Sequence, residues 1–85
     1  ASQADLDKIN AALIGSPSVD AVIHMRTQHI GPEEILLAAK LEYDSALTFE
    51  QLAHAIDATE AAVREAVPAT RMIYIEPDVR RTPAS

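Results

Sequence analysis

The side chains best suited to chemistry in this 85-residue chain are three histidines set among thirteen aspartates and glutamates. The chain has no cysteine, which excludes disulfides, thiolate metal sites and cysteine nucleophiles together. Imidazole and carboxylate groups in combination bind divalent cations such as Zn²⁺ or Mn²⁺. The chemistry open to this sequence is therefore cation binding by histidine and carboxylate ligands.

The first candidate pair is His24 and Glu76, which strand alternation places on the same face of a predicted sheet. If their strands are neighbours, or if two copies meet at a two-fold axis, His24 and Glu76 would approach each other. One imidazole and one carboxylate from each of two chains would supply four ligands for a metal ion. The alternative is a surface or interface histidine, with Glu76 paired to Arg26 or Lys40. Spacing alone carries no metal signature, and this alternative needs no ligand.

The other two histidines lie where polar residues are common. His29 falls in a predicted turn with two glutamates close in sequence, a setting in which an exposed metal ion binds weakly. His54 lies off the apolar stripe of its helix and shares its face with Glu50 and Asp57. An ordinary solvated turn and an ordinary solvated helix face are the simpler interpretations of these two positions.

Several classes of function find no support in the sequence. The net charge of −6 argues against a nucleic-acid partner, which would need lysine and arginine clusters. The chain has no glycine-rich phosphate loop and no His-Glu-x-x-His helix. The serines Ser16, Ser18 and Ser45 lie in turn-like contexts that explain them. We therefore predict a protein that is not an enzyme and that requires no cofactor, with Zn²⁺ or another divalent cation as its candidate ligand.

The elements that must position these groups follow from hydrophobic periodicity. A capping serine, Ser2, opens a helical pattern that stops at Gly15, and Thr48 with Gln51 forms a capping box for a second helix. Period-two alternation indicates three strands, with a Gly31-Pro32 turn joining the first two as an antiparallel pair. The predicted helix, strand, strand, helix and strand cover residues 2–14, 19–26, 35–43, 48–67 and 71–76.

This order predicts an α+β fold of the ferredoxin-like α-β-β-α-β kind, similar to metallochaperone folds. Right-handed crossover rules leave few topologies, and the second helix must return the third strand alongside the sheet. We expect one domain over residues 1–79 and a flexible tail over residues 80–85.

Two helices can cover only one face of a three-stranded sheet, so the other face is expected to be exposed. An exposed apolar sheet face is normally a partner surface. Because a short core of small aliphatic residues gains stability by oligomerisation, we predict a homodimer. The predicted interface residues are Val22, Leu36, Ala38, Met72 and Tyr74.

Four segments in register resemble the C-terminal cytoplasmic domain of cation diffusion facilitator (cation efflux) transporters. Residues 25–32 resemble that family's leucine-arginine-threonine to glycine-proline turn, and residues 38–42 resemble its second strand. Residues 73–77 are similar to its closing strand, which ends in an acid and a proline, and residues 48–67 are similar to its second helix. The resemblance covers nearly the whole chain.

The resemblance implies a homodimeric domain on the cytoplasmic side of the inner membrane, fused after a transmembrane domain that exports divalent metal cations in exchange for protons. No stretch of this chain is apolar enough to span a membrane, so that partner domain is expected upstream. Family members use this domain for dimerisation and metal sensing. The alternative is a free-standing ferredoxin-like module that binds metal or senses a small molecule.

The sequence departs from the family at its usual histidine ligands. The closing-strand position is Tyr74, the first-strand position is Ile23, and the helix position is Ala53. The second-strand position falls at Ala39 or Lys40, while Glu76 keeps the acid. If the resemblance to the family holds, two modes of dimerisation remain open. The domain either dimerises constitutively or responds to metal through His24 and Glu76.

Overall fold

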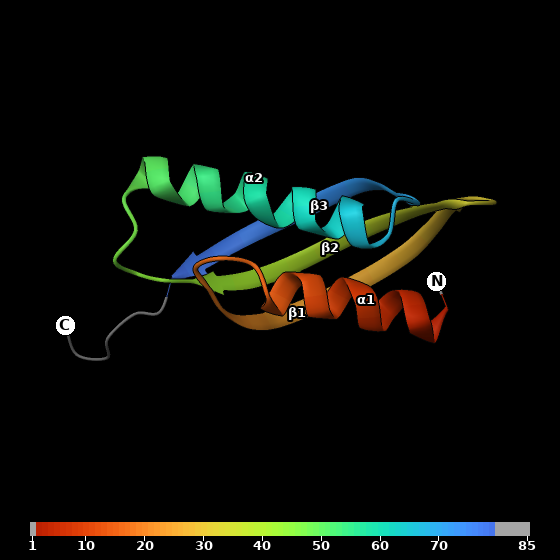
Figure 1. The fold of residues 1–85 in the computed structure, drawn as a ribbon, viewed down its shortest axis with the longest axis horizontal. Helices are drawn as coiled ribbons and strands as arrows, with labels where there is room; N and C mark the ends of the chain where they lie inside the picture. The colour runs from red at the N-terminus through yellow and green to blue at the C-terminus, as the bar shows by residue number, and fades with distance from the viewer. Residues whose placement is uncertain (1, 80–85) are drawn as a thin grey trace.

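The computed structural model describes residues 2–79, and the order of its elements confirms the prediction (Figure 1). The elements are α1 (Gln3–Ile14), β1 (Val19–Gly31), β2 (Glu34–Tyr43), α2 (Phe49–Ala66) and β3 (Thr70–Val79). The predicted tail over residues 80–85 lies outside the described residues. The described chain is elongated, with principal extents of 47 × 23 × 18 Å.

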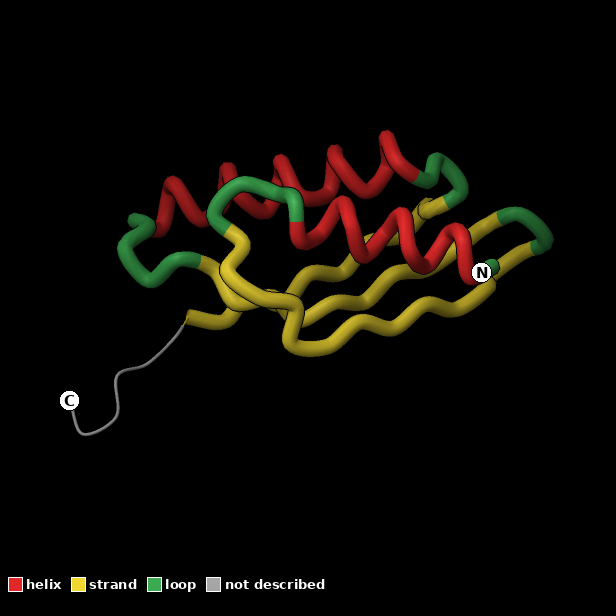
Figure 2. Tube along the Cα trace, turned by 60° about the horizontal axis from the view of Figure 1, so that its bottom comes forward, coloured by secondary structure: helices red, strands yellow, loops and turns green. Residues whose placement is uncertain are grey.

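The three strands form one mixed sheet in the order β1-β2-β3, so β2 is central and β1 and β3 are the edges. β1 pairs antiparallel with β2, as the hairpin prediction requires. β3 pairs parallel with β2 after the α2 crossover, and it contains Pro77 opposite Leu41. Figure 2 shows both helices over the same face of the sheet, which confirms the predicted ferredoxin-like arrangement.

The core lies between that face and the helices. β2 alternates as predicted, with every second side chain buried. The buried apolar residues of β2 are Ile35, Leu37, Ala39, Leu41 and Tyr43. Ile9 and Leu13 of α1 complete this layer with Ala55 and Val63 of α2.

One polar contact is enclosed in this core. The Tyr43 hydroxyl lies 2.9 Å from Thr59 Oγ1, and both residues are fully buried. The Thr59 hydroxyl donates to the Ala55 carbonyl over 2.8 Å, so Tyr43 is the donor to Thr59. Burial raises the pKa of the Tyr43 phenol.

β1 does not alternate as predicted. A register shift between Val22 and His24 sets an extra residue of β1 against β2. Val22 and Met25 consequently both pack against the core, whereas Ile23 is 48% exposed. The prediction that Val22 belongs to the exposed face is wrong, because the bulge reverses the alternation before it.

The predicted cap of α2 is present, but its apolar stripe is shifted. Thr48 Oγ1 accepts a hydrogen bond from the Gln51 amide, and the Gln51 side chain accepts one from the Thr48 amide. The helical spacing of Phe49 from Leu52 and Ile56 predicts that it is buried with them, but Phe49 is 88% exposed. At 3.6 residues per turn Phe49 lies about 120° around the helix from the buried Ala55. It therefore points away from the core.

Candidate functional site

The candidate site is the sheet face that no helix covers, called here the open face. Strand pairing and side-chain alternation assign four positions of each strand to it. The β1 members lie opposite β2 members that in turn lie opposite β3 members. The open face comprises Ala21, His24, Arg26, Gln28, Leu36, Ala38, Lys40, Glu42, Met72, Tyr74, Glu76 and Asp78.

The middle of the open face is apolar. Leu36 is paired with Met72 across β2 and β3, and Ala38 is paired with Tyr74. Met72 is 42% exposed and Tyr74 is 55% exposed, although both are large side chains with apolar surface. The structure therefore places four of the five predicted interface residues together on the open face, and Val22 is the exception. Whether a second copy covers them stays a prediction.

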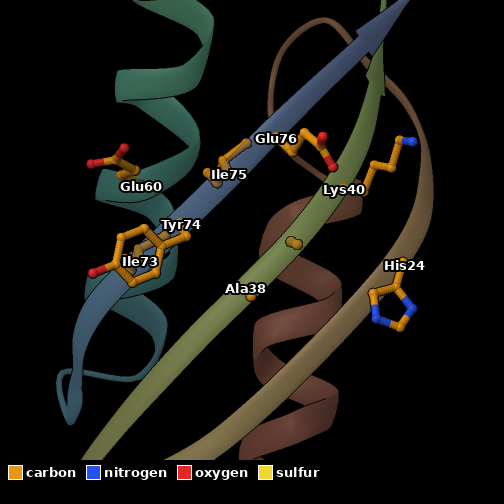
Figure 3. Close-up of a pocket in the computed structure, with 9 residues that line it drawn as sticks. His24, Ala38, Lys40, Glu60, Ile73, Tyr74, Ile75 and Glu76 are labelled. Atoms are coloured by element: carbon orange, nitrogen blue, oxygen red, sulfur yellow. The ribbon is translucent and has the colours of Figure 1, made fainter.

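A charged row, defined as His24, Lys40 and Glu76, crosses the sheet beside this apolar part. His24 is opposite Lys40 in the antiparallel pair, and Lys40 is opposite Glu76 in the parallel pair. Figure 3 shows Lys40 between the other two, with the Glu76 side chain extending toward it. All three line a shallow cavity of about 430 Å³, together with Tyr74 and Glu60.

His24 and Glu76 are not neighbours within one chain. Strand periodicity leaves the order of the strands open, and in the structure β2 lies between β1 and β3. Two strand spacings put their backbones about 10 Å apart. Within residues 2–79, no three histidine, aspartate or glutamate side chains form a group that could hold a metal ion. A shared His24–Glu76 site therefore requires a second copy.

The remaining histidines lie away from the open face. His29 is within β1, which continues to Gly31, so the predicted turn begins later than expected. With Asp5 and Glu33 it lines a second cavity, of about 530 Å³, near the start of α1. His54 is exposed on α2, as the helix pattern predicts. The three histidines are thus on three separate surfaces.

Lys40 is the member of the charged row that sequence reasoning passed over as a site residue. The signal for it was present, because β2 alternation alone places Lys40 on the face opposite Ala39 and Leu41. Its importance comes from the central position of β2, which local pattern does not reveal. Neither Lys40 nor Glu76 forms an ion pair within the described residues, whereas Arg64 and Arg71 do so elsewhere.

No family model and no curated protein matches the chain, but solved structures do. A histidine-to-alanine variant of the MamM C-terminal domain is 26% identical, with a TM-score of 0.85 over 95% of this chain and 100% of that one. A nickel form of an aspartate-to-asparagine variant gives 25% identity, a TM-score of 0.84 and coverages of 94% and 100%. A copper form of an aspartate-to-histidine variant is 25% identical, with a TM-score of 0.83 over 93% of this chain and 98% of that one.

The agreement extends over nearly the full length of both chains, and it includes the element order and the mixed sheet. The chain therefore has the ferredoxin-like fold of the MamM C-terminal domain. The solved neighbours are C-terminal domains of a cation diffusion facilitator transporter, the family that the four segments of this sequence resemble. No helix within residues 2–79 is long and apolar enough to cross a membrane.

Proposed function

We propose that this chain is the cytoplasmic dimerisation and regulatory domain of a divalent-cation exporter, and that it is not an enzyme. The observation that carries the proposal is the near-complete structural match to the MamM C-terminal domain at a TM-score of 0.85. Variants of that domain have nickel, copper and cadmium forms, which supports a role close to divalent cations. The partner in the same polypeptide would be a transmembrane domain.

A homodimer formed through the open face is the second part of the proposal. Leu36, Ala38, Met72 and Tyr74 expose apolar area in one contiguous region, which a matching copy would remove from water. An interface of this kind is isologous, because the same patch contributes from both copies. Tyr74 suits such a site, since its ring supplies contact area while its hydroxyl stays hydrated.

Cation binding, where it occurs, would use residues from both copies. His24 and Glu76 are the favoured ligands, because both lie on the open face, where a second copy would supply its own His24 and Glu76. Within one chain the two residues lie on strands separated by β2. His29 beside Glu33, and His54 on α2, are weaker candidates for Zn²⁺ or another divalent ion. Each of these two offers a single exposed imidazole on a solvated surface.

Sedimentation equilibrium of chelator-stripped protein, repeated with increasing Zn²⁺, tests the dimer. We expect a dimer that the variant Met72→Asp disrupts, because a buried unpaired carboxylate would replace an apolar contact. The matched control is Phe49→Asp, which places the same group on an exposed side chain of α2. A wild-type chain that stays monomeric at all concentrations, with and without metal, would contradict the proposal.

A further inference from the structure

The open face carries one pair of opposite charges in adjacent register. Lys40 of β2 and Glu76 of β3 are Cα partners, and their side chains leave the sheet on the same side. Neighbouring strands are about 4.8 Å apart, so the two charges form a compact dipole on the sheet surface. The remaining open-face carboxylates, Glu42 and Asp78, lie one register step further along the same strands.

These two charges are free to meet a partner. Neither forms an ion pair within residues 2–79, and Glu76 is exposed while Lys40 is half-buried. The other cations of α2 and β3 are already engaged, since Arg64 lies 3.6 Å from Glu60 and Arg71 lies 3.7 Å from Glu34. A chain with a net charge of −6 also repels its own copy, and a positive charge at the contact offsets part of that repulsion.

Two-fold symmetry makes such a dipole self-complementary. In an isologous contact, residue i meets residue j of the other copy and residue j meets residue i. An axis passing between Lys40 and Glu76 would set Lys40 against the partner's Glu76, and Glu76 against the partner's Lys40. The four groups then alternate in sign around the axis. A single-sign row would repel itself under the same operation.

We infer that Lys40 and Glu76 of two copies form this alternating tetrad, and that it makes open-face association independent of metal. The inference rests on the proposed open-face dimer and adds its charge recognition and its regulation. Lys40 lies between His24 and Glu76 in the charged row, so its ammonium puts a positive charge beside the two candidate ligands. The domain thereby carries a covalently attached cation at its dimer axis.

Charge reversal tests the pairing. In sedimentation equilibrium with chelator, Lys40→Glu and Glu76→Lys should each weaken dimerisation roughly tenfold or more, because each creates two like-charge contacts per dimer. The double variant Lys40→Glu/Glu76→Lys should return the dissociation constant to within about threefold of wild type, since the reversed pairs are again complementary. Lys8→Glu makes the same charge change on the exposed surface of α1 and should leave the constant within about threefold.

Removing the positive charge of Lys40 tests whether this charge makes dimerisation independent of metal. Lys40→Gln leaves two imidazoles and two carboxylates from a pair of copies, a set suited to Zn²⁺. We expect this variant to dimerise about tenfold more tightly with Zn²⁺ than with chelator, and His24→Ala added to it should abolish the difference. Wild type should show less than a threefold difference.

The outcomes separate the two proposals. A wild-type monomer under all conditions would overturn the open-face dimer and the tetrad with it. A wild-type dimer that tolerates either single reversal, or that the double reversal fails to restore, would overturn the tetrad alone. Wild-type dimerisation that needs Zn²⁺ would likewise overturn metal independence while leaving the dimer in place. Far-ultraviolet circular dichroism of each variant confirms that a weakened dimer is still folded.

Discussion

The enclosed pair of hydroxyls in the core allows a quantitative test of the packing. The substitution Thr59→Val keeps the shape of the side chain but removes the oxygen that accepts from the Tyr43 hydroxyl at 2.9 Å. Tyr43 is fully buried, so its hydroxyl would be left without a partner. A buried donor that loses its partner costs about 1–3 kcal/mol, and we expect Thr59→Val to lower the free energy of unfolding by that amount.

The reciprocal substitution should be milder. In Tyr43→Phe the phenol oxygen is removed, while the Thr59 hydroxyl keeps its bond to the Ala55 carbonyl at 2.8 Å. The expected loss is about 0.5–1.5 kcal/mol, the net value of one intramolecular hydrogen bond. Adding Tyr43→Phe to Thr59→Val removes the orphaned donor, so the double variant should be more stable than Thr59→Val alone.

Urea unfolding of the four proteins provides the measurement. A change of 1 kcal/mol corresponds to a shift in Tm of about 4–8 °C for a domain of this size, so thermal unfolding is a sufficient second probe. The double-mutant cycle should give a coupling free energy of about 1 kcal/mol. Strictly additive losses would refute the reasoning, because they would mean that the two hydroxyls do not depend on each other.

Three further predictions concern single features. Replacing the helix cap in Thr48→Ala should cost about 1 kcal/mol of unfolding free energy by urea titration, since the Gln51 amide loses its acceptor. Because burial raises the folded-state pKa of Tyr43 above its ordinary 10.0, the unfolded chain releases this proton first. Stability that is fully present below about pH 10 should therefore fall as pH rises through the folded pKa, and less so in Tyr43→Phe. Phe49→Ser should change stability by less than about 0.5 kcal/mol, because the side chain is 88% exposed, and a larger loss in thermal unfolding would contradict that placement.

Local chemistry in the sequence was enough to predict the elements and most of the core. β2 follows period two because one face is buried and the other is not, and every second residue from Ile35 to Tyr43 is in the core. The capping box at Thr48 was equally readable, since it depends on residues three positions apart. These signals depend only on residues within one helical turn or one strand, so the sequence is enough to identify them.

The errors concern features that polarity does not encode. The bulge after Val22 is a change of backbone register, so apolar residues stand on both sides of it without marking it. Phe49 is apolar and close to helical spacing, yet its angular offset from Ala55 exposes it. The separation of His24 from Glu76 by Lys40 follows from strand order, which depends on the whole chain.

The two edge strands of the sheet limit how copies of this domain can associate. An unprotected edge strand recruits further strands through its free N–H and C=O groups and so seeds fibrils. β1 is interrupted by register shifts, and β3 contains Pro77, which has no N–H to offer an incoming strand. Strand-by-strand growth is therefore impeded at both sides, and contact between copies is left to the face. The proposed open-face contact would close on itself after two copies, so association through it would stop at the dimer.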